Sequence, residues 1–548
     1  MFFRERFDDQ EMQRRSPASA GDWSASSTRG MVATAHYLAT SAGVAMLERG
    51  GNALDAAVAA AFALGVCEPA GSGMGGMAVL LAHHAATGRT SLIDGACRAP
   101  MAAHPLEVAR SKRYRGHRAV AVPRSVAALS HVLARYGRLG RREVLEPAIA
   151  LAEDGFPTTA LQHALAQRYR GSLRQRSAGA LFLDGDHRPW PPGTLLRQPT
   201  LARTLRRLEA DGFEDFYHGA IAREIVADME RHQGFVGAAD LDTAFEVSES
   251  EPIWGSFDDS QVATAGPPGG GLTLLQMLHM ASSLAWEDLD LEHPAGVGRV
   301  AALVARARAD RVRQRLRTGA DVPGRAADLL DPANAAQAAR ECLEPGDERR
   351  DRPGPPAALG PGETTHVSAM DGEGNVVSLT LSIERSFGAA VVTPELGFVY
   401  NGYLRAFKVR NRSHPHYLRP GAPARSNAAP TILFRNGRPW AAVGSTGSER
   451  ICSGIFQVLL RLRRSEPFDA VHGPRLHATP ERHVLWEEER FPRGSREALL
   501  DRGFSVESLA PYSFQLGGLQ LVTRGGATFT GVGEPRRDGA ATGPRERE

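Results

Sequence analysis

Thr364, Thr365 and His366 are the residues whose types and spacing best suit catalysis. They begin the segment ETTHVSAMDGEGNVVSLT, where a stretch rich in proline, glycine and charge gives way to strand-like alternation. A threonine hydroxyl within a chain is a weak nucleophile and requires an activating base. His366 is one candidate base, but a single strand histidine more often serves packing or hydrogen bonding.

Cleavage of the Glu363–Thr364 bond would supply a second candidate base. The new α-amine would have a reference pKa of about 7.7–8.0 and would sit on the same residue as the hydroxyl. Thr364 would then provide both nucleophile and base. The Pro/Gly-rich stretch before it would let the released end leave the site. Two threonines at a strand start are also common, so these residues alone leave both readings open.

The sequence lacks the motifs of the commonest alternative classes, which are dinucleotide-binding proteins, serine hydrolases and zinc hydrolases. GSGMGG, residues 71–76, fits the spacing of a dinucleotide-binding loop, but a helix precedes it and a strand follows it, the reverse of the order required. We expect a close-packed turn beside a substrate pocket. The sequence contains no G-x-S-x-G and no HExxH, and its histidines do not cluster at ligand spacing. We therefore expect no metal and no organic cofactor.

Composition argues against several classes of partner. The 548 residues are 42% hydrophobic and 23% charged, with a formal net charge of only +3 and dispersed arginines. We expect no nucleic-acid or membrane partner. Cys67, Cys97, Cys342 and Cys452 lie far apart, which argues against a disulfide framework. The charged start, MFFRERFDDQEMQRRSPAS, lacks the apolar core of a secretory signal, so a cytoplasmic location is expected.

The elements that must position these residues follow from patterning. Residues 1–29 are polar and predict a flexible arm, and GGNALDAAVAAAFALGV predicts a buried helix capped by Asn52, with Asp55 in its first turn. Helical patterns dominate from about 100 to 250, and 317–363 reads as a mobile linker. Strands are predicted at 364–370 and 376–382, in PTILFRNGRPWAAVGS around an Asn-Gly turn, and in LQLVTRGGATFTGVG. The prediction is an α/β protein, helical before the linker and strand-rich after it.

Four blocks of sequence, taken together, resemble the γ-glutamyltranspeptidase family. They are GMVATAHYLATSAGVAMLERGGNALDAAVAAAFALGVCEPAGSGMGG, ETTHVSAMDGEGNVVSLT, APTILFRNGRPWAAVGSTGSERI and GEPRRDGAATG. They occur in the family's order, and the resemblance runs from about residue 30 to 543.

This resemblance implies a fold, a maturation step and a set of partners. The fold would be the four-layer αββα sandwich of an N-terminal-nucleophile hydrolase. The precursor would cleave itself into a large subunit, 30–363, and a small subunit, 364–548, of 548 − 363 = 185 residues. The two subunits would stay together and act on a small molecule. Thr364 would attack the Glu363 carbonyl in maturation and a substrate carbonyl in turnover.

The resemblance also assigns supporting roles near the nucleophile. Thr380 and Ser382 match hydroxyl positions beside it, with serine where the family usually has threonine. The oxyanion hole would come from the backbone N–H groups of Gly447 and Ser448, where the family has two glycines. A backbone donor survives a Gly→Ser change if the geometry is kept.

The predicted acyl-binding residues depart from the family's pattern. Arginine is replaced by Ala96, with Arg98 two residues on, and an aspartate by Ala406. The further substrate-binding positions are Glu384, Tyr403, Ser426 and Asn427. Replacing a charged clamp by alanine leaves a substrate charge unpaired.

Three hypotheses follow. The first is an active hydrolase or acyltransferase with altered acyl specificity, for which Arg98, Arg385 and Arg405 favour an anionic acyl group. The family's divergent branches include oxamate amidohydrolases, cephalosporin acylases and natural-product homologues that cut a C–C bond beside a carbonyl. The second is an ordinary γ-glutamyl enzyme acting on glutathione-like substrates, in which Glu384 binds the amine and Arg98 the carboxylate. The third is an inactive binding homologue.

Overall fold

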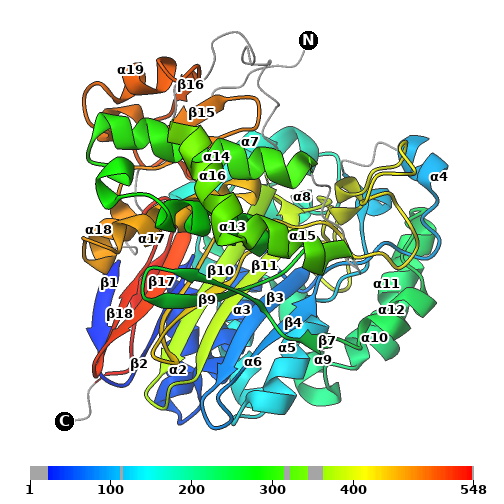
Figure 1. The fold of residues 1–548 in the computed structure, drawn as a ribbon. Coiled ribbons are helices and arrows are strands. Elements are labelled where there is room, and N and C mark those ends of the chain that lie inside the picture. The colour runs from blue at the N-terminus through cyan, green and yellow to red at the C-terminus, as the bar shows by residue number, and fades with distance from the viewer. Residues whose placement is uncertain (1–22, 111–114, 314–320, 344–361, 546–548) are drawn as a thin grey trace.

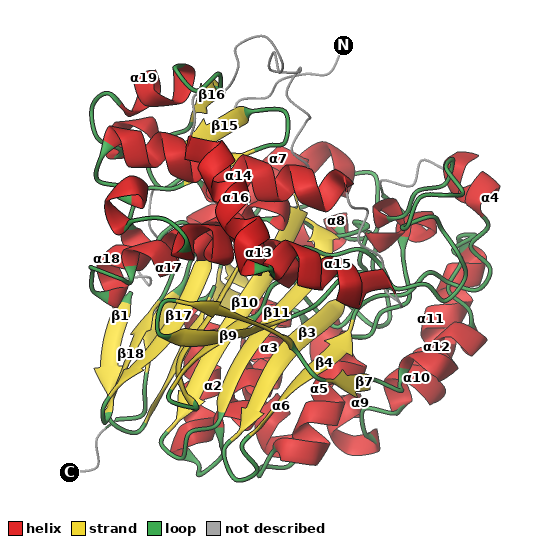
Figure 2. Cartoon of the chain, viewed as in Figure 1, coloured by secondary structure: helices red, strands yellow, loops and turns green. Residues whose placement is uncertain are grey.

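Two β-sheets lie face to face between two layers of helices (Figure 1). This arrangement comes from a computed structural model of the uncut chain, which describes residues 23–110, 115–313, 321–343 and 362–545. Figure 2 shows the helices gathered on the outer sides of the stacked sheets. The predicted four-layer αββα order is therefore confirmed.

The first sheet has seven antiparallel strands in the order β1-β18-β17-β13-β12-β9-β8. Their bounds are β1 Ser24–Ser27, β18 Thr528–Val532, β17 Leu519–Gly525, β13 Arg438–Ser445, β12 Thr431–Arg435, β9 Ser260–Thr264 and β8 Ile253–Phe257. The β12–β13 hairpin turns at Asn436 and Gly437, which both have positive φ, so the predicted Asn-Gly turn is confirmed.

The second sheet also has seven antiparallel strands, in the order β19-β2-β10-β11-β3-β4-β7. Their bounds are β19 Ala540–Thr542, β2 Gly30–Thr34, β10 Gly362–Asp371, β11 Val376–Arg385, β3 Met77–His84, β4 Arg89–Gly95 and β7 Ser248–Ser250. β10 and β11 lie at the centre, and β10 faces β13 and β17 of the first sheet. The predicted nucleophile thus lies on a central strand of the sandwich.

Different helices cover the outer faces of the two sheets. On the second sheet lie α2 Tyr37–Glu48, α3 Ala53–Cys67 and α5 Ser125–Tyr136, with α6 Arg141–Asp154 and α9 Pro199–Asp211 beyond them. On the first lie α13 Gly271–Ser282, α17 Ile451–Arg461 and α18 Pro467–His472, with α14 Pro294–Arg313 and α16 Pro332–Leu343 packed on α13. The remaining described α-helices are α4 Pro105–Arg110, α7 Ala160–Leu173, α8 Gly179–Phe182, α10 Asp215–His218, α11 Ala220–Arg231, α12 Ala238–Ala244, α15 Asp321–Leu330 and α19 Ser495–Leu500.

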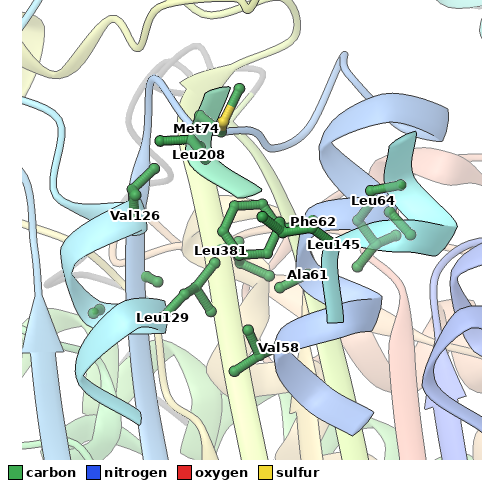
Figure 3. Close-up of a cluster of buried hydrophobic side chains, with 14 of the residues drawn as sticks. Val58, Ala61, Phe62, Leu64, Met74, Val126, Leu129, Leu145, Leu208 and Leu381 are labelled. Carbon is green, nitrogen blue, oxygen red and sulfur yellow. The ribbon is translucent and has the colours of Figure 1, made fainter. Parts of the chain in front are cut away.

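The largest cluster of buried hydrophobic side chains packs β11 against α3. Phe62 of α3 and Leu381 of β11 are both buried there and lie close together in Figure 3. Because side chains alternate along a strand, Leu381 points to the helices while its neighbour Ser382 points the other way. Asn52 caps α3 and forms a capping box with Asp55, which is the structural role the sequence predicts for both residues. Packing of α3 therefore holds the strand that presents Ser382.

Strands are denser after the predicted linker, as the sequence predicts: ten of the nineteen described strands, β10 to β19, follow it, although the longer part before it also contributes strands. β2, β3, β4, β7, β8 and β9 come before it and contribute to both sheets. The strand predicted after GSGMGG is β3. β3 pairs with β4 and β8 with β9 in local hairpins, whereas β2, β7 and the other edge of β9 pair with strands distant in sequence, which local patterning does not register.

Two predicted flexible segments are partly ordered. Ser24–Ser27, inside the predicted arm, form β1 because their backbone pairs with β18; residues 1–22 lie outside the described ranges. Inside the predicted linker, α15 and α16 occupy 321–330 and 332–343, while 344–361 lie outside the description. Ala335, Ala338 and Ala339 are buried at helical spacing, a signal that proline, glycine and charge obscured. No helix in the described ranges is both long and apolar enough to cross a lipid bilayer.

Candidate active site

Thr364 lies beside an irregularity in the pairing of β10 with β11. The register shifts just after Glu363, which pairs with Glu384, so that β11 has one more residue than β10 across this step. The resulting bulge contains Ser382, whose hydroxyl oxygen accepts a hydrogen bond from the Thr364 hydroxyl at 3.4 Å. Both side chains are buried. A strand irregularity therefore brings the predicted nucleophile to Ser382.

Ser382 also binds the carbonyl of the predicted cleavage site. Its hydroxyl donates to the Glu363 carbonyl oxygen at 2.7 Å and accepts from the Glu384 backbone N–H at 3.0 Å. The side chain of Tyr403 hydrogen-bonds to Ser382 and Ser426, and burial raises the pKa of the Tyr403 phenol. The phenol is therefore protonated at neutral pH. These hydroxyls form one polar group around the bond between Glu363 and Thr364.

The two predicted oxyanion residues lie where the chain turns from β13 into α17. Gly447 has φ of 101° and Ser448 has φ of 56°, both in the left-handed region. A side chain at Gly447 would meet Gly517 Cα at 2.9 Å, so this turn needs glycine. The short 3₁₀ turn Ser448–Arg450 contacts β10. Neither backbone N–H has a hydrogen-bond acceptor among the described residues, which leaves both available to a bound oxyanion.

His366 lies between the two sheets. Its ring bonds the hydroxyls of Thr380 at 3.0 Å, Ser368 at 3.2 Å and Ser378 at 3.3 Å. Burial lowers the pKa of His366 to about 3, so the imidazole is neutral at physiological pH. His366 therefore has a packing and hydrogen-bonding role. The Thr380 hydroxyl, which was predicted to lie beside the nucleophile, hydrogen-bonds to the His366 ring and not to Thr364.

The predicted amine-binding residue Glu384 is surrounded by arginines. Its carboxylate pairs with Arg405 at 3.3 Å, and Arg385 and Arg115 add positive charge nearby. Burial raises the pKa of Glu384, against the lowering effect of these arginines. Ala406 leaves no acidic group at the position beside Arg405. This corner therefore presents more positive than negative charge.

The remaining predicted acyl-binding residues lie on segments that pack together, because Ser426 hydrogen-bonds to Tyr403 and Arg98 forms a β-bridge with Pro423. Ser426 and Ala96 line a cavity of about 250 Å³ beside the Gly266–Gly269 turn. The Ser426 hydroxyl accepts from the Ala428 backbone N–H at 3.0 Å. Asn427 packs its backbone against Gly270. The Arg98 side chain is exposed to solvent.

Sequence reasoning missed the charged residues on the other side of the nucleophile. Arg537 donates to the Glu363 carboxylate at 3.0 Å and to the Thr446 hydroxyl at 2.9 Å. Glu68, directly after α3, interacts with the Thr365 hydroxyl. Burial, opposed by Arg537, raises the pKa of Glu68 to about 7. Arg537 and Glu363 are 174 residues apart, so spacing gives no signal of their pairing.

GSGMGG forms the expected close-packed turn between α3 and β3. A side chain at Gly75 would meet the Val399 carbonyl oxygen at 2.3 Å, and one at Gly76 would meet the Ser382 carbonyl oxygen at 2.5 Å. These glycines therefore allow the backbone to approach the strand that carries Ser382.

Histidines that lie far apart in sequence come together in one place. His117 Nε2 and His232 Nδ1 each lie 3.1 Å from the Asp228 carboxylate, a grouping that could hold a metal ion. The two imidazole rings stack at 4.2 Å, and Thr393 donates to the same carboxylate. Hydrogen bonds to Asp228 account for this arrangement. Sequence spacing does not predict this grouping, because the two histidines are 115 residues apart.

The layered fold and this site define an N-terminal-nucleophile hydrolase in its uncut form. The gamma-glutamyltranspeptidase family model matches residues 39–543. The chain belongs to the gamma-glutamyltranspeptidase family.

Its relatives include both glutathione hydrolases and acylases. The chain is 30% identical to the glutathione hydrolase proenzyme of Bacillus subtilis, over 94% of this chain and 91% of that protein. It is 34% identical to the Acylase ACY 1 proenzyme of Pseudomonas sp. strain V22, over 88% of each. The crystal structure of a cephalosporin acylase from Bacillus halodurans superposes with a TM-score of 0.85 at 26% identity, covering 96% of this chain and 97% of that one. The protein is therefore an enzyme of the hydrolase and transferase class.

Proposed function

We propose that the protein is a self-processing threonine hydrolase or acyltransferase that carries a small anionic acyl group on Thr364. The observation that carries this proposal is the double contact of Ser382. Its hydroxyl accepts from the Thr364 hydroxyl at 3.4 Å and donates to the Glu363 carbonyl at 2.7 Å. Nucleophile and acyl carbon are thus held together in the uncut chain.

Self-cleavage begins when the Thr364 hydroxyl oxygen adds to the Glu363 carbonyl carbon. The hydroxyl proton passes through Ser382 to the Thr364 nitrogen as the C–N bond breaks, leaving an ester and a free α-amine. Water then hydrolyses this ester, which gives Glu363 a carboxylate and restores the Thr364 hydroxyl. Hydrogen bonding to the carbonyl oxygen stabilises the negative charge that develops there.

Turnover repeats this chemistry on a substrate. The α-amine takes the Thr364 hydroxyl proton while the oxygen attacks the substrate carbonyl, and it returns the proton to the leaving group. Water or an acceptor amine resolves the acyl-enzyme. Gly447 and Ser448 supply backbone donors for the oxyanion.

The anionic preference is supported by the charges around the site. Arg405, Arg385 and Arg115 surround Glu384, where an ordinary γ-glutamyl enzyme would need to bind an α-ammonium group. A buried cation placed among three arginines would be repelled. A γ-glutamyl substrate is the second candidate, favoured by the glutathione hydrolase relatives. Cleavage of a C–C bond beside a carbonyl, as in some homologues, would use the same nucleophile.

The proposal is tested by intact mass and a denaturing gel of the purified protein. We expect two fragments that separate between Glu363 and Thr364, and a single chain for Thr364→Ala. A wild-type chain that stays whole after long incubation would contradict the proposal and favour an inactive binding homologue.

Substrate assays then distinguish the acyl classes. We expect turnover of anionic acyl anilides to exceed that of a γ-glutamyl anilide. Robust γ-glutamyl turnover that is lost in Thr364→Ala would instead establish the ordinary enzyme. Release of a ketone's acyl fragment as a free acid, again lost in Thr364→Ala, would establish C–C cleavage.

A further inference from the structure

His117, Asp228 and His232 form a cluster of potential metal ligands that the chemistry at Thr364 does not use. Asp228 lies near the end of α11 and His232 directly follows this helix, so that their spacing of four residues places them on one side. His117 begins the 3₁₀ turn His117–Ala119. Within the ranges that the structure describes, no other set of three histidine, cysteine or acidic side chains lies close enough together to hold one metal ion.

The ligand atoms of this cluster lie at nearly the separations that a zinc ion requires. Nε2 of His117 and Nδ1 of His232 each lie 3.1 Å from the nearer oxygen of the Asp228 carboxylate, and one ligand atom from each residue lies within 4.8 Å of the others. Two ligands about 2.1 Å from a tetrahedral zinc ion are about 3.4 Å apart. The His232 ring now stacks on the His117 ring, but its side chain is 46% exposed and can turn its nitrogen toward an ion.

One oxygen of the Asp228 carboxylate is available to a cation. The side chain is only 1% exposed, and its Oδ1 accepts no hydrogen bond from the described part of the chain. Nδ1 of His232 hydrogen-bonds instead to the Asp228 backbone carbonyl at 3.0 Å, and the Arg231 guanidinium stays 3.9 Å from Oδ1. A buried anionic oxygen without a donor is unfavourable, and a bound cation would satisfy it.

The chain after the predicted cut helps to position the cluster. Thr393 donates to the other carboxylate oxygen at 2.9 Å and shares a hydrogen bond of 2.8 Å with the Tyr400 hydroxyl. Beside His117, the Gly116 backbone N–H donates to the Ala389 carbonyl at 2.8 Å. Outer contacts of this kind fix the orientation of metal ligands. The three side chains are therefore held in place from both sides of the Glu363–Thr364 bond.

We propose that His117, Asp228 and His232 bind a zinc ion, with water as the fourth ligand on the exposed side of the cluster. Two imidazoles and a carboxylate suit zinc, whereas Mg²⁺ and Ca²⁺ take oxygen ligands. The ion fastens α11 to the turn that begins at His117 and stabilises the folded protein. The expectation of no metal was drawn from sequence spacing, which does not register groups that only the fold brings together.

The test is a calorimetric titration of the purified, chelator-treated full chain with ZnCl₂. We expect the wild type to bind one zinc ion per chain tightly. His232→Gln should weaken this binding by about 10²-fold or more, because it removes one of three ligands. His218→Gln is the matched control and should bind as the wild type does. It removes an exposed histidine that lies 3.5 Å from the Asp242 carboxylate, a pair that has no third ligand among the described residues.

Thermal unfolding supplies a second readout, because a ligand that binds only the folded state raises the unfolding temperature. Saturating zinc should raise this temperature for the wild type and for His218→Gln but not for His232→Gln. The same concentration of Mg²⁺ should have no effect. A wild type that binds no zinc, a His232→Gln variant that binds zinc as tightly as the wild type, or equal stabilisation by Mg²⁺ would each overturn the proposal.

Two further measurements keep the result independent of variant folding and of the proposed function. If His232→Gln does not fold, the visible spectrum of Co²⁺ bound to the wild type decides. The intense bands of four-coordinate Co²⁺ support the site, and the weak spectrum of six-coordinate Co²⁺ overturns it. Thr364→Ala should bind zinc as tightly as the wild type, because all three ligands are in place in the uncut chain; loss of binding in that variant would contradict the proposal.

Discussion

Ser382 contacts both the nucleophile and the bond that self-cleavage would break. Replacing it with alanine removes the donor to the Glu363 carbonyl and the acceptor for the Thr364 hydroxyl. Loss of one such donor typically costs about 10²–10³ in rate. We expect Ser382→Ala to slow precursor cleavage by that factor, followed as the precursor band on a denaturing gel.

Matched variants make this result specific. Ser382→Thr keeps the hydroxyl and should cut at close to the wild-type rate. Ser453→Ala removes a buried hydroxyl that bonds His477 elsewhere in the molecule, and should also cut normally. If Ser382→Ala matured as fast as Ser453→Ala, Ser382 would have no part in the reaction.

Glu68 makes the stability of the uncut chain depend on pH. Its pKa is raised to about 7 in the folded chain from 4.5, mainly by burial, so the folded state binds more protons than the unfolded state between these values. Stability contributed by the protonated carboxyl is present below about pH 4.5 and is lost as pH rises through 7. At 1.36 kcal/mol per pKa unit, the loss is on the order of 3 kcal/mol.

Glu68→Gln should remove this loss because the amide does not ionise. In a Thr364→Ala background, which keeps Glu363 in place, we expect the glutamine variant to gain stability relative to Glu68 between pH 5 and pH 8, measured by denaturant unfolding. An equal difference between the two proteins at both pH values would show that Glu68 does not titrate in this range.

At the scale of elements, the packing of β10 on β13 depends on the absence of a side chain at Gly444. A Cβ at Gly444 of β13 would lie 2.1 Å from Cε1 of His366 on β10. Overpacking of this kind typically costs about 1–3 kcal/mol. We expect Gly444→Ala to destabilise the protein by at least that amount and His366→Ala to relieve the clash.

A double-mutant cycle measures the contact directly. The free energy lost by the double variant should be clearly smaller than the sum of the two single losses, because the two changes share one space. Gly525→Ala in β17, where nothing lies within 4 Å of the added carbon, should have little effect and serves as the control. Simple additivity would mean that the two strands adjust without strain.

Elements with strong local signals could be predicted from sequence. The Asn52 cap predicts the start of α3, and the turn at Asn436 and Gly437 predicts the β12–β13 hairpin, because both signals lie within a few residues. β8 and β9 form a hairpin with each other, but their turn at Asp258 and Asp259 lacks the Asn-Gly signal, and β9 also pairs with β12 far along the chain. α15 and α16 could not be predicted, because the segment that contains them has a composition typical of disorder.

The site shows the same division between local and long-range information. Motif resemblance placed Thr364 and Ser382 near each other, and the structure brings their hydroxyls to 3.4 Å. The pairing of Glu363 with Arg537 depends on the folded course of 174 residues and leaves no mark in either segment alone. The position of Arg98 on the surface likewise follows from the fold and not from its neighbours in sequence.

At the scale of the whole molecule, a cut before Thr364 would leave each of the two fragments with strands in both sheets. The first half contributes β1, β8 and β9 to one sheet and β2, β3, β4 and β7 to the other; the second contributes the remaining strands. We expect the cut protein to elute as one particle of at least 58.8 kDa and to give two bands only after denaturation. Elution of separate halves under native conditions would contradict this interleaving.

The position of Arg537 and β19 late in the chain also bears on when the enzyme becomes active. β19, residues 540–542, pairs with β2, which lies beside β10, and Arg537 holds the residue before the nucleophile. A nascent chain that stops before these residues lacks both the strand and the cation. Self-cleavage would then occur only after β19 has been made and has paired with β2, so the nucleophile would stay blocked until folding is nearly complete.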